Sequence, residues 1–299
     1  MRLLAALAAL SLLASPAMLH AEPIPAAVTT DPPADKARPA GMYAFALPTH
    51  GVKINAVLFT AAGAGPHPTV LLLHGLPGNE QNLDLAQAIR RDGWNVLTLH
   101  YRGAWGSPGA FTFTHVLEDS AAALAWLRTP ENAAAHDIDP KKLVVIGHSM
   151  GGWAAAYTGG HDPDLLGTGL ISTADIGMIG AAPRAMAVKI VDDNIGTGAG
   201  MHTLAATPES LADEAIKYAK TFAVAGDAPG LSRHPLLIVT SDDGLTPVGD
   251  GIAKAIGDGA APVTQVHIAT DHSYSDHRIA LEATVLRWLE NLPGAPAGL

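Results

Sequence analysis

The sequence contains no cysteine among its 299 residues. The chain therefore has no disulfide framework, no thiolate ligand for zinc and no cysteine nucleophile. Positive charge is also scarce: 18 Lys and Arg residues stand against 28 Asp and Glu residues, and the formal net charge is −10. Binding to nucleic acid needs a basic face, and an anionic membrane surface attracts basic runs. The composition therefore argues against both kinds of partner.

The longest apolar run lies at the N-terminus. Residues 1–13 contain one arginine followed by almost uninterrupted apolar residues, and a small-x-small pattern follows at 15–17. This order is typical of a secretory signal peptide. We therefore expect residues 1–21 to be a signal peptide, cleaved after Ala17 or Ala21, and the bacterial protein to be periplasmic or secreted. An uncleaved membrane anchor is the alternative, but the run is short for a span, so we expect no stable membrane association after cleavage.

The residues around Ser149 form the most informative motif of the chain. An apolar, β-branched run at 143–146 enters the sequence Gly147-His148-Ser149-Met150-Gly151, and a helix of small residues follows. Strand, tight turn and helix are the context of a nucleophile elbow, in which a strained turn exposes the serine hydroxyl. Glycines flank the serine because a β-carbon there would collide with the neighbouring strand and helix. The motif predicts that Ser149 is a nucleophile.

This motif resembles the elbow of the α/β-hydrolases, and the resemblance covers most of the chain. Members of that fold carry their catalytic residues in the order serine, acid, histidine. Asp243 and His272 follow Ser149 in this order, each after an expected strand. A serine hydroxyl needs a base to take its proton, and a carboxylate fixes the tautomer of the histidine that does so. The resemblance therefore implies a triad of Ser149, Asp243 and His272.

Two other aspartates compete for the role of the acid. Asp242 directly precedes Asp243, but Pro247 follows Asp243 by four residues, which is the spacing of the family. Asp175 follows the sixth expected strand, where some members of the family carry the acid. We expect Asp243 to be the acid and keep the other two as alternatives.

A second histidine competes for the role of the base. His277 is expected in the first turn of the last helix, with Ser275 as its N-cap. His272 is expected on the preceding loop, which leaves it free to turn toward the serine. Fourteen histidines are present in all, but none has the HExxH spacing of a zinc site. We expect His272 to be the base, and no metal or cofactor to be used.

The resemblance also implies an oxyanion hole. In α/β-hydrolases, a His-Gly-x-Pro-Gly turn after the third strand supplies one backbone N–H, and the residue after the nucleophile supplies the second. The sequence His74-Gly75-Leu76-Pro77-Gly78 follows an apolar run at 69–73. These positions assign the two donors to Leu76 and Met150. Trp105 lies in a downstream loop that resembles loops of esterases and dipeptidyl-peptidase-like enzymes; it either lines the substrate pocket or packs the loop.

The pattern of apolar runs predicts the fold. Residues 22–40 are rich in Pro, Ala, Thr and Asp and should form a flexible lead-in to a hydrolase domain at 41–299. Strands alternating with helices imply a mostly parallel sheet with helices on both faces. Two or three helices at about 174–233 should form a small cap inserted after the sixth strand. The eight expected strands are Met42–Leu47, Val52–Phe59, Thr69–Leu73, Asn95–Leu99, Lys142–Ile146, Leu166–Ser172, Pro235–Thr240 and Val263–Ile268.

These features together predict a secreted serine hydrolase that cleaves carboxylic esters through an acyl-enzyme. A peptidase of the same fold is the near alternative, and a non-catalytic binding protein is the distant one. The expected partner is a small-molecule ester. The sequence leaves open the acyl chain length, the natural substrate and the oligomeric state, because the cap sets the shape of the pocket.

Overall fold

The computed structural model describes residues 23–199, 201–257 and 261–296; the expected signal peptide at 1–21 lies outside this part of the chain. The described residues form one sheet of eight strands in the order β1-β2-β4-β3-β5-β6-β7-β8. The strands are β1 Gly41–Thr49, β2 Val52–Thr60, β3 His67–Leu73, β4 Asn95–Leu99, β5 Ile138–His148, β6 Gly167–Ile171, β7 Leu236–Thr240 and β8 Val263–His267. The helices are α1 Ala26–Thr29, α2 Leu83–Arg91, α3 Phe113–Arg128, α4 Pro130–Ala135, α5 Met150–His161, α6 Ile176–Ala181, α7 Arg184–Ile195, α8 Pro208–Lys217, α9 Ala228–Leu231, α10 Thr246–Ile256 and α11 Arg278–Glu290, with 3-10 turns η1 Thr197–Ala199 and η2 Val224–Asp227.

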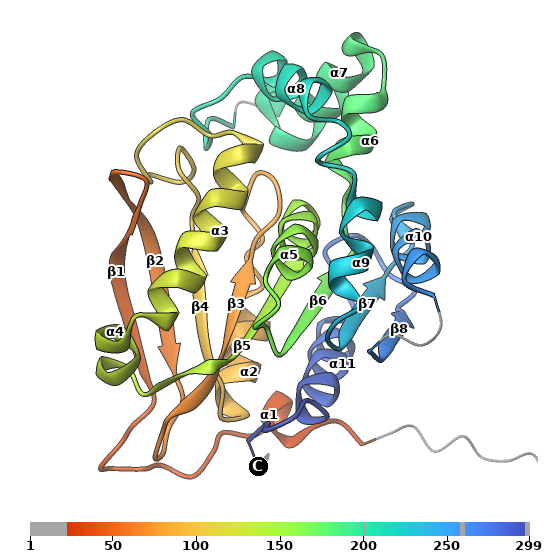
Figure 1. Cartoon of the computed structure of the whole chain (residues 1–299). Helices are drawn as coiled ribbons and strands as arrows, with labels where there is room; N and C mark the ends of the chain where they lie inside the picture. The colour runs from red at the N-terminus through yellow and green to blue at the C-terminus, as the bar shows by residue number, and fades with distance from the viewer. Residues whose placement is uncertain (1–22, 200, 258–260, 297–299) are drawn as a thin grey trace, which may run out of the picture.

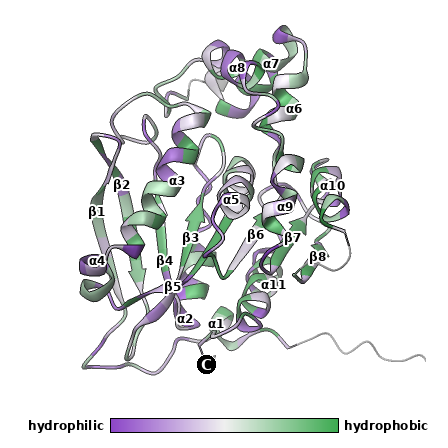
Figure 2. Ribbon diagram, viewed as in Figure 1, coloured by the Kyte–Doolittle hydropathy of each residue, from purple (hydrophilic) through white to green (hydrophobic). Residues whose placement is uncertain are grey.

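The sheet is mostly parallel, with antiparallel pairs at one edge. β1 and β2 form an antiparallel hairpin at one edge, and β2 pairs antiparallel with β4. All the later pairs are parallel. Every residue of β3, β4, β6 and β7 is buried, which is the pattern of strands covered on both faces. Figure 2 shows these strands as the hydrophobic centre of the molecule.

Helices cover both faces of the sheet (Figure 1). One apolar core lies under α3, α5, α9 and α10, and it includes Phe113, Trp153 and Ile252. The other core lies under α1, α2 and α11, and it includes Leu85 and Leu286. The expectation of an eight-stranded, mostly parallel sheet with helices on both faces is confirmed.

The insertion between β6 and β7 consists of two structural parts. Helices α6, α7 and α8 stand together above the carboxyl ends of the parallel strands (Figure 1). Helix α8 packs so closely on α6 that a β-carbon at Gly180 would lie only 2.0 Å from the carbonyl oxygen of Ala215. By contrast, η2 and α9 pack on α5. The predicted range of the cap, 174–233, therefore combines the raised helices with a final segment that lies against the main body.

Several local predictions were wrong. The lead-in at 22–40 contains the helical turn α1, whose Ala27 is buried and accepts a hydrogen bond from Arg91. The apolar spacing along the two helices predicts that Ile279 and Leu83 face inward, but their exposed fractions are 53% and 43%. Both lie in the first turn of their helices, where a short apolar pattern does not define a buried face. Among the described residues, no helix is both long and apolar enough to cross a membrane.

Candidate active site

Ser149 lies on a sharp turn between β5 and α5. Its φ of 58° is in the left-handed region, which is unusual for a residue with a side chain. Its N–H donates to the carbonyl oxygen of Ile171 at 2.9 Å, which joins the turn to β6. A β-carbon on Gly147 would lie 1.9 Å from the carbonyl oxygen of Gly151, and one on Gly151 would lie 2.1 Å from that of Leu73. The two glycines are therefore required for the close approach of strand, turn and helix, as the sequence predicted.

His272 and Asp243 meet on the loops that follow β8 and β7. The Nδ1 atom of His272 lies 2.7 Å from Oδ2 of Asp243. A carboxylate only accepts hydrogen bonds, so Nδ1 carries the proton and donates it, which leaves the lone pair on Nε2. The Asp243 side chain is 4% exposed and that of His272 is 40% exposed. The acid is thus buried behind a histidine that solvent and substrate can reach.

Several donors keep Asp243 ionised. Burial alone would raise the pKa of this carboxyl, but hydrogen bonds from His272, from the backbone N–H of Leu245 and from the hydroxyls of Ser172 and Ser241 outweigh it. The pKa of Asp243 therefore lies well below its usual range. Ser172 also contacts Ser241 at 2.9 Å. The acid is a fixed negative charge within a network of hydroxyl groups.

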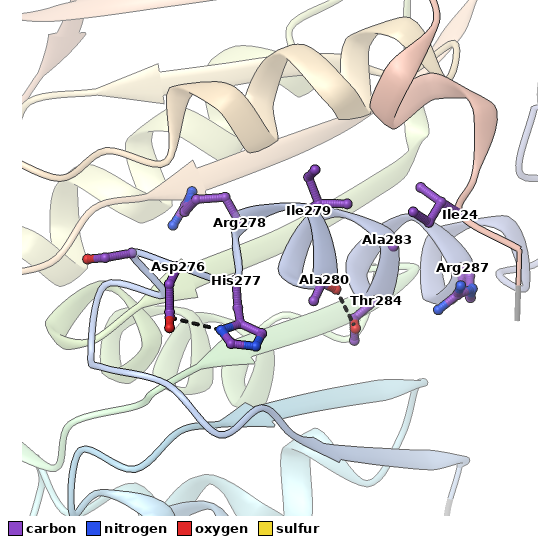
Figure 3. Close-up of a pocket in the computed structure, with 10 residues that line it drawn as sticks. Ile24, Asp276, His277, Arg278, Ile279, Ala280, Ala283, Thr284 and Arg287 are labelled. Atoms are coloured by element: carbon purple, nitrogen blue, oxygen red, sulfur yellow. Dashed lines mark hydrogen bonds and ion pairs between the residues drawn. The ribbon is translucent and has the colours of Figure 1, made fainter. Parts of the chain in front are cut away.

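The alternative acids and base have other partners than the members of the predicted triad. Asp242 contacts His267 at 3.1 Å and its side chain is 65% exposed. Asp175 is the N-cap of α6 and accepts a hydrogen bond from the N–H of Met178. His277 contacts Asp276 at 2.8 Å and lines a different pocket along α11 (Figure 3).

The structure brings neither alternative aspartate to His272. It also corrects the prediction about the start of the last helix. The N-cap is His277 itself, and the N–H of Ser275 donates to Asp271.

The backbone N–H groups predicted for the oxyanion hole belong to residues that line the pocket around Ser149. Met150 is the first residue of α5, where an N–H has no partner within the helix. Leu76 lies on the turn after β3, two residues beyond the buried His74. Within the described part of the chain, neither N–H has a hydrogen-bond acceptor. Both are available to a ligand in the pocket.

A pocket of about 660 Å³ surrounds Ser149 and His272. Its far wall comes from α6 and α7, and its near wall from the loops after β3 and β7. Most of its lining is apolar: Leu76, Met150, Ala174, Ile176, Met178, Ile179, Ile190, Val191, Leu245, Pro247 and Val248. No group of three or more histidine or acidic side chains in the described ranges has an arrangement that could hold a metal ion. The arrangement suits nucleophilic attack on a largely apolar substrate.

Part of the chain is similar in sequence to known proteins. The model of the serine aminopeptidase family, S33, matches residues 64–194. The sn-1-specific diacylglycerol lipase ABHD11 of Xenopus tropicalis is 33% identical over 108 residues, which are 35% of this chain and 30% of that protein. The lysophosphatidylserine lipase ABHD12 of Danio rerio is 30% identical over 88 residues, which are 28% of this chain and 21% of that protein. The chain therefore spans less than a third of the length of either curated relative.

Solved structures share the whole fold. The carboxylesterase EstE1, cloned from a metagenomic library, superposes with a TM-score of 0.58 at 21% identity, over 84% of this chain and 90% of that one. The acylaminoacyl peptidase of Pyrococcus horikoshii superposes with a TM-score of 0.59 at 14% identity, over 88% of this chain and 43% of that one. The chain has the fold of the α/β-hydrolases. The family match at residues 64–194 includes the elbow serine, Ser149.

One buried residue beside the site, His148, was not predicted from the sequence. His148, directly before the nucleophile, lies with its Nε2 2.8 Å from the carbonyl oxygen of His272, and the two rings are 4.7 Å apart. Burial lowers the pKa of His148 to about 4, so the ring is neutral and its Nε2–H donates to that carbonyl. His148 therefore fixes the loop that carries His272. A sequence in which these residues are 124 positions apart gives no sign of this contact.

Trp105 does not line the pocket around Ser149. Its indole N–H instead donates to the carbonyl oxygen of Pro77 at 2.7 Å. Of the two roles that the sequence allowed, the geometry favours packing of the loop over contact with the substrate.

Proposed function

We propose that this protein is a serine hydrolase that cleaves carboxylic esters by way of an acyl-enzyme on Ser149. In the first step, the Ser149 hydroxyl oxygen attacks the ester carbonyl carbon while Nε2 of His272 takes the hydroxyl proton. The negative charge on the carbonyl oxygen is held by the N–H groups of Leu76 and Met150. His272 then returns the proton to the departing alcohol. Asp243 stays ionised and stabilises the imidazolium between these steps.

Water completes the reaction by the same route. His272 takes a proton from the water as it attacks the acyl carbon, and the proton is then given back to the Ser149 oxygen. The products are a carboxylic acid and the free enzyme. The ester and one water molecule supply all the atoms of the two products, the alcohol and the carboxylic acid.

Both carboxylates in the pocket already accept hydrogen bonds from this chain, which favours an ester substrate over a peptide with a free N-terminus. An aminopeptidase must bind a substrate ammonium, and an unpaired carboxylate is the usual partner for such a charge. Among the described residues that line the pocket, the acidic ones are Asp175 and Asp243. Asp175 already accepts from the backbone N–H groups of Met178, Gly177 and Val224, and Asp243 is held by His272. Both carboxylates are therefore already engaged by donors of this chain.

A peptidase stays the second candidate because of the match to the serine aminopeptidase family. Purified enzyme assayed with p-nitrophenyl esters of graded acyl length, beside aminoacyl-p-nitroanilides, separates the two. The proposal predicts ester hydrolysis with kcat/KM at least about a hundredfold above that for the anilides. Faster cleavage of an anilide with a free amino group contradicts it. No turnover of either class supports the distant alternative, a binding protein without catalysis.

We also propose that the protein is exported from a bacterial cell to the periplasm or medium. The apolar run and the small-x-small pattern before residue 22 support this. N-terminal sequencing of exported protein should find Met18 or Glu22 as the first residue. An intact Met1 on membrane-bound protein contradicts the proposal.

A further inference from the structure

Two side chains of one loop hold the two ends of the oxyanion turn. The hydroxyl of Tyr101 donates to the carbonyl oxygen of His74 at 3.2 Å. The indole N–H of Trp105 donates to the carbonyl oxygen of Pro77 at 2.7 Å. Leu76 lies between these two anchored positions, so both bonds restrain the peptide units that flank its N–H.

Packing makes these restraints firm. Tyr101 is fully buried, and its ring centre lies 4.6 Å from that of His74. Burial raises the pKa of Tyr101 well above its usual range, so its hydroxyl keeps its proton. A β-carbon on Gly78 would lie 2.8 Å from the Trp105 indole nitrogen, and the φ of Gly78 is +105°. The turn therefore fits against the tryptophan with no space to shift toward it.

The same loop is joined to the cap. The backbone N–H of Trp105 donates to the carbonyl oxygen of Thr203 at 2.9 Å, and the N–H of Ala205 donates to that of Gly103 at 2.7 Å. Residues 203–205 connect η1 to α8. The loop thus contacts the oxyanion turn through its side chains and the cap through its backbone.

We propose that Tyr101 and Trp105 are positioning residues that direct the Leu76 N–H at the oxyanion, with the cap segment 203–205 holding their loop in place. This inference rests on the proposed function, in which Leu76 stabilises the tetrahedral intermediate. Oxyanion donors act only when they lie about 2.7–3.1 Å from the position of the developing charge. A turn released at either end would let its N–H leave that range while the substrate pocket keeps its shape.

The variants Trp105→Phe and Tyr101→Phe test this, because each removes one donor and keeps an aromatic ring. Each should lower kcat by about tenfold, since complete loss of an oxyanion donor costs about 10²–10³. KM should stay within about twofold, because neither side chain lines the pocket. Affinity for phenylboronic acid, which forms a tetrahedral adduct with a catalytic serine, should fall with kcat. Trp126→Phe is the matched control: Trp126 stacks on Phe45, and this variant should keep wild-type values.

The outcomes are distinguishable. A raised KM with unchanged kcat in Trp105→Phe overturns the inference and makes Trp105 a substrate contact. Wild-type kcat and boronate affinity in both folded variants overturn it as well. If Trp105→Phe fails to fold, as judged by circular dichroism, Tyr101→Phe alone decides. Wild-type enzyme that neither hydrolyses esters nor binds the boronate contradicts the proposed function instead.

Discussion

Replacing Asp119 with asparagine should strongly destabilise the fold, because this carboxylate is a buried charge with three donors. Asp119 lies on α3 and is 0% exposed. It accepts from the Thr49 hydroxyl at 2.8 Å, from the Arg102 backbone N–H at 2.8 Å and from Arg102 Nε at 2.7 Å. Asparagine keeps the size of the side chain, so the variant removes the charge without leaving a cavity.

The magnitude follows from the burial of both partners. Arg102 is only 6% exposed, and removing one partner of a buried ion pair costs about 3–5 kcal/mol. Glu118 also pairs with Arg102, so we expect the lower end, about 3 kcal/mol. For a chain of this size, such a loss lowers Tm by about 6–12 °C.

Thermal unfolding followed by circular dichroism measures the effect. The control is Asp213→Asn, which breaks the bidentate pair between Arg184 and Asp213. Both of these side chains are more than half exposed, so Tm should not change measurably. Equal shifts in the two variants, or no shift in Asp119→Asn, would refute the reasoning.

Three further predictions address the acid, the pH response and the pocket. Asp243→Asn should lower kcat by a factor of about 10⁴, whereas Asp242→Asn should leave kcat within about tenfold of the wild type. Steady-state kinetics on the two purified variants test this, and the opposite order would show that Asp243 is not the acid. Burial raises the pKa of Asp92 to about 7 in the folded state. Between about pH 4 and 7, Asp92 is therefore protonated in the folded state and ionised in the unfolded chain. The free energy of unfolding falls as pH rises through this window. At about pH 8, Asp92→Asn should therefore have a free energy of unfolding about 1–2 kcal/mol above that of the wild type, and at about pH 4 the two should differ little, as measured by urea unfolding. A difference that does not vary with pH would contradict this. Ile190→Trp should shift the acyl preference toward shorter chains by about tenfold in relative kcat/KM, while Met186→Trp, at an exposed site on the same helix, should not; equal profiles for the two variants argue against an acyl pocket beneath α7.

The elements that the sequence predicted well are those with local causes. The elbow at Ser149 combines a buried strand, two glycines and a helix within ten residues, and the clash that requires Gly147 arises from the nearby backbone of Gly151. The alternation of strands and helices similarly fixes a parallel sheet, because each crossover needs its own helix. The choice of Asp243 over Asp242 as the acid rests on the spacing to Pro247 and stays a prediction.

The contacts that orient the site could not be predicted in this way. His148 bonds to the backbone of His272, and Trp105 bonds to the backbone of Pro77. Each contact joins segments that are far apart in the sequence, and every residue type has a backbone carbonyl, so the sequence does not show which carbonyl accepts the hydrogen bond. From its resemblance to loops of esterases and dipeptidyl-peptidase-like enzymes, the loop that carries Trp105 allowed either substrate contact or packing. Only the fold shows that the indole N–H bonds to Pro77.

The central claim is that Ser149 is a nucleophile activated by His272, and covalent labelling tests it most directly. Wild-type enzyme treated with a fluorophosphonate should gain one adduct, found by mass spectrometry on the peptide that contains Ser149. Ser149→Ala should gain none, and His272→Ala should label at least about a hundredfold more slowly because the base is missing. An adduct on Ser149→Ala, or wild-type labelling rates in His272→Ala at equal folded content, would contradict the account.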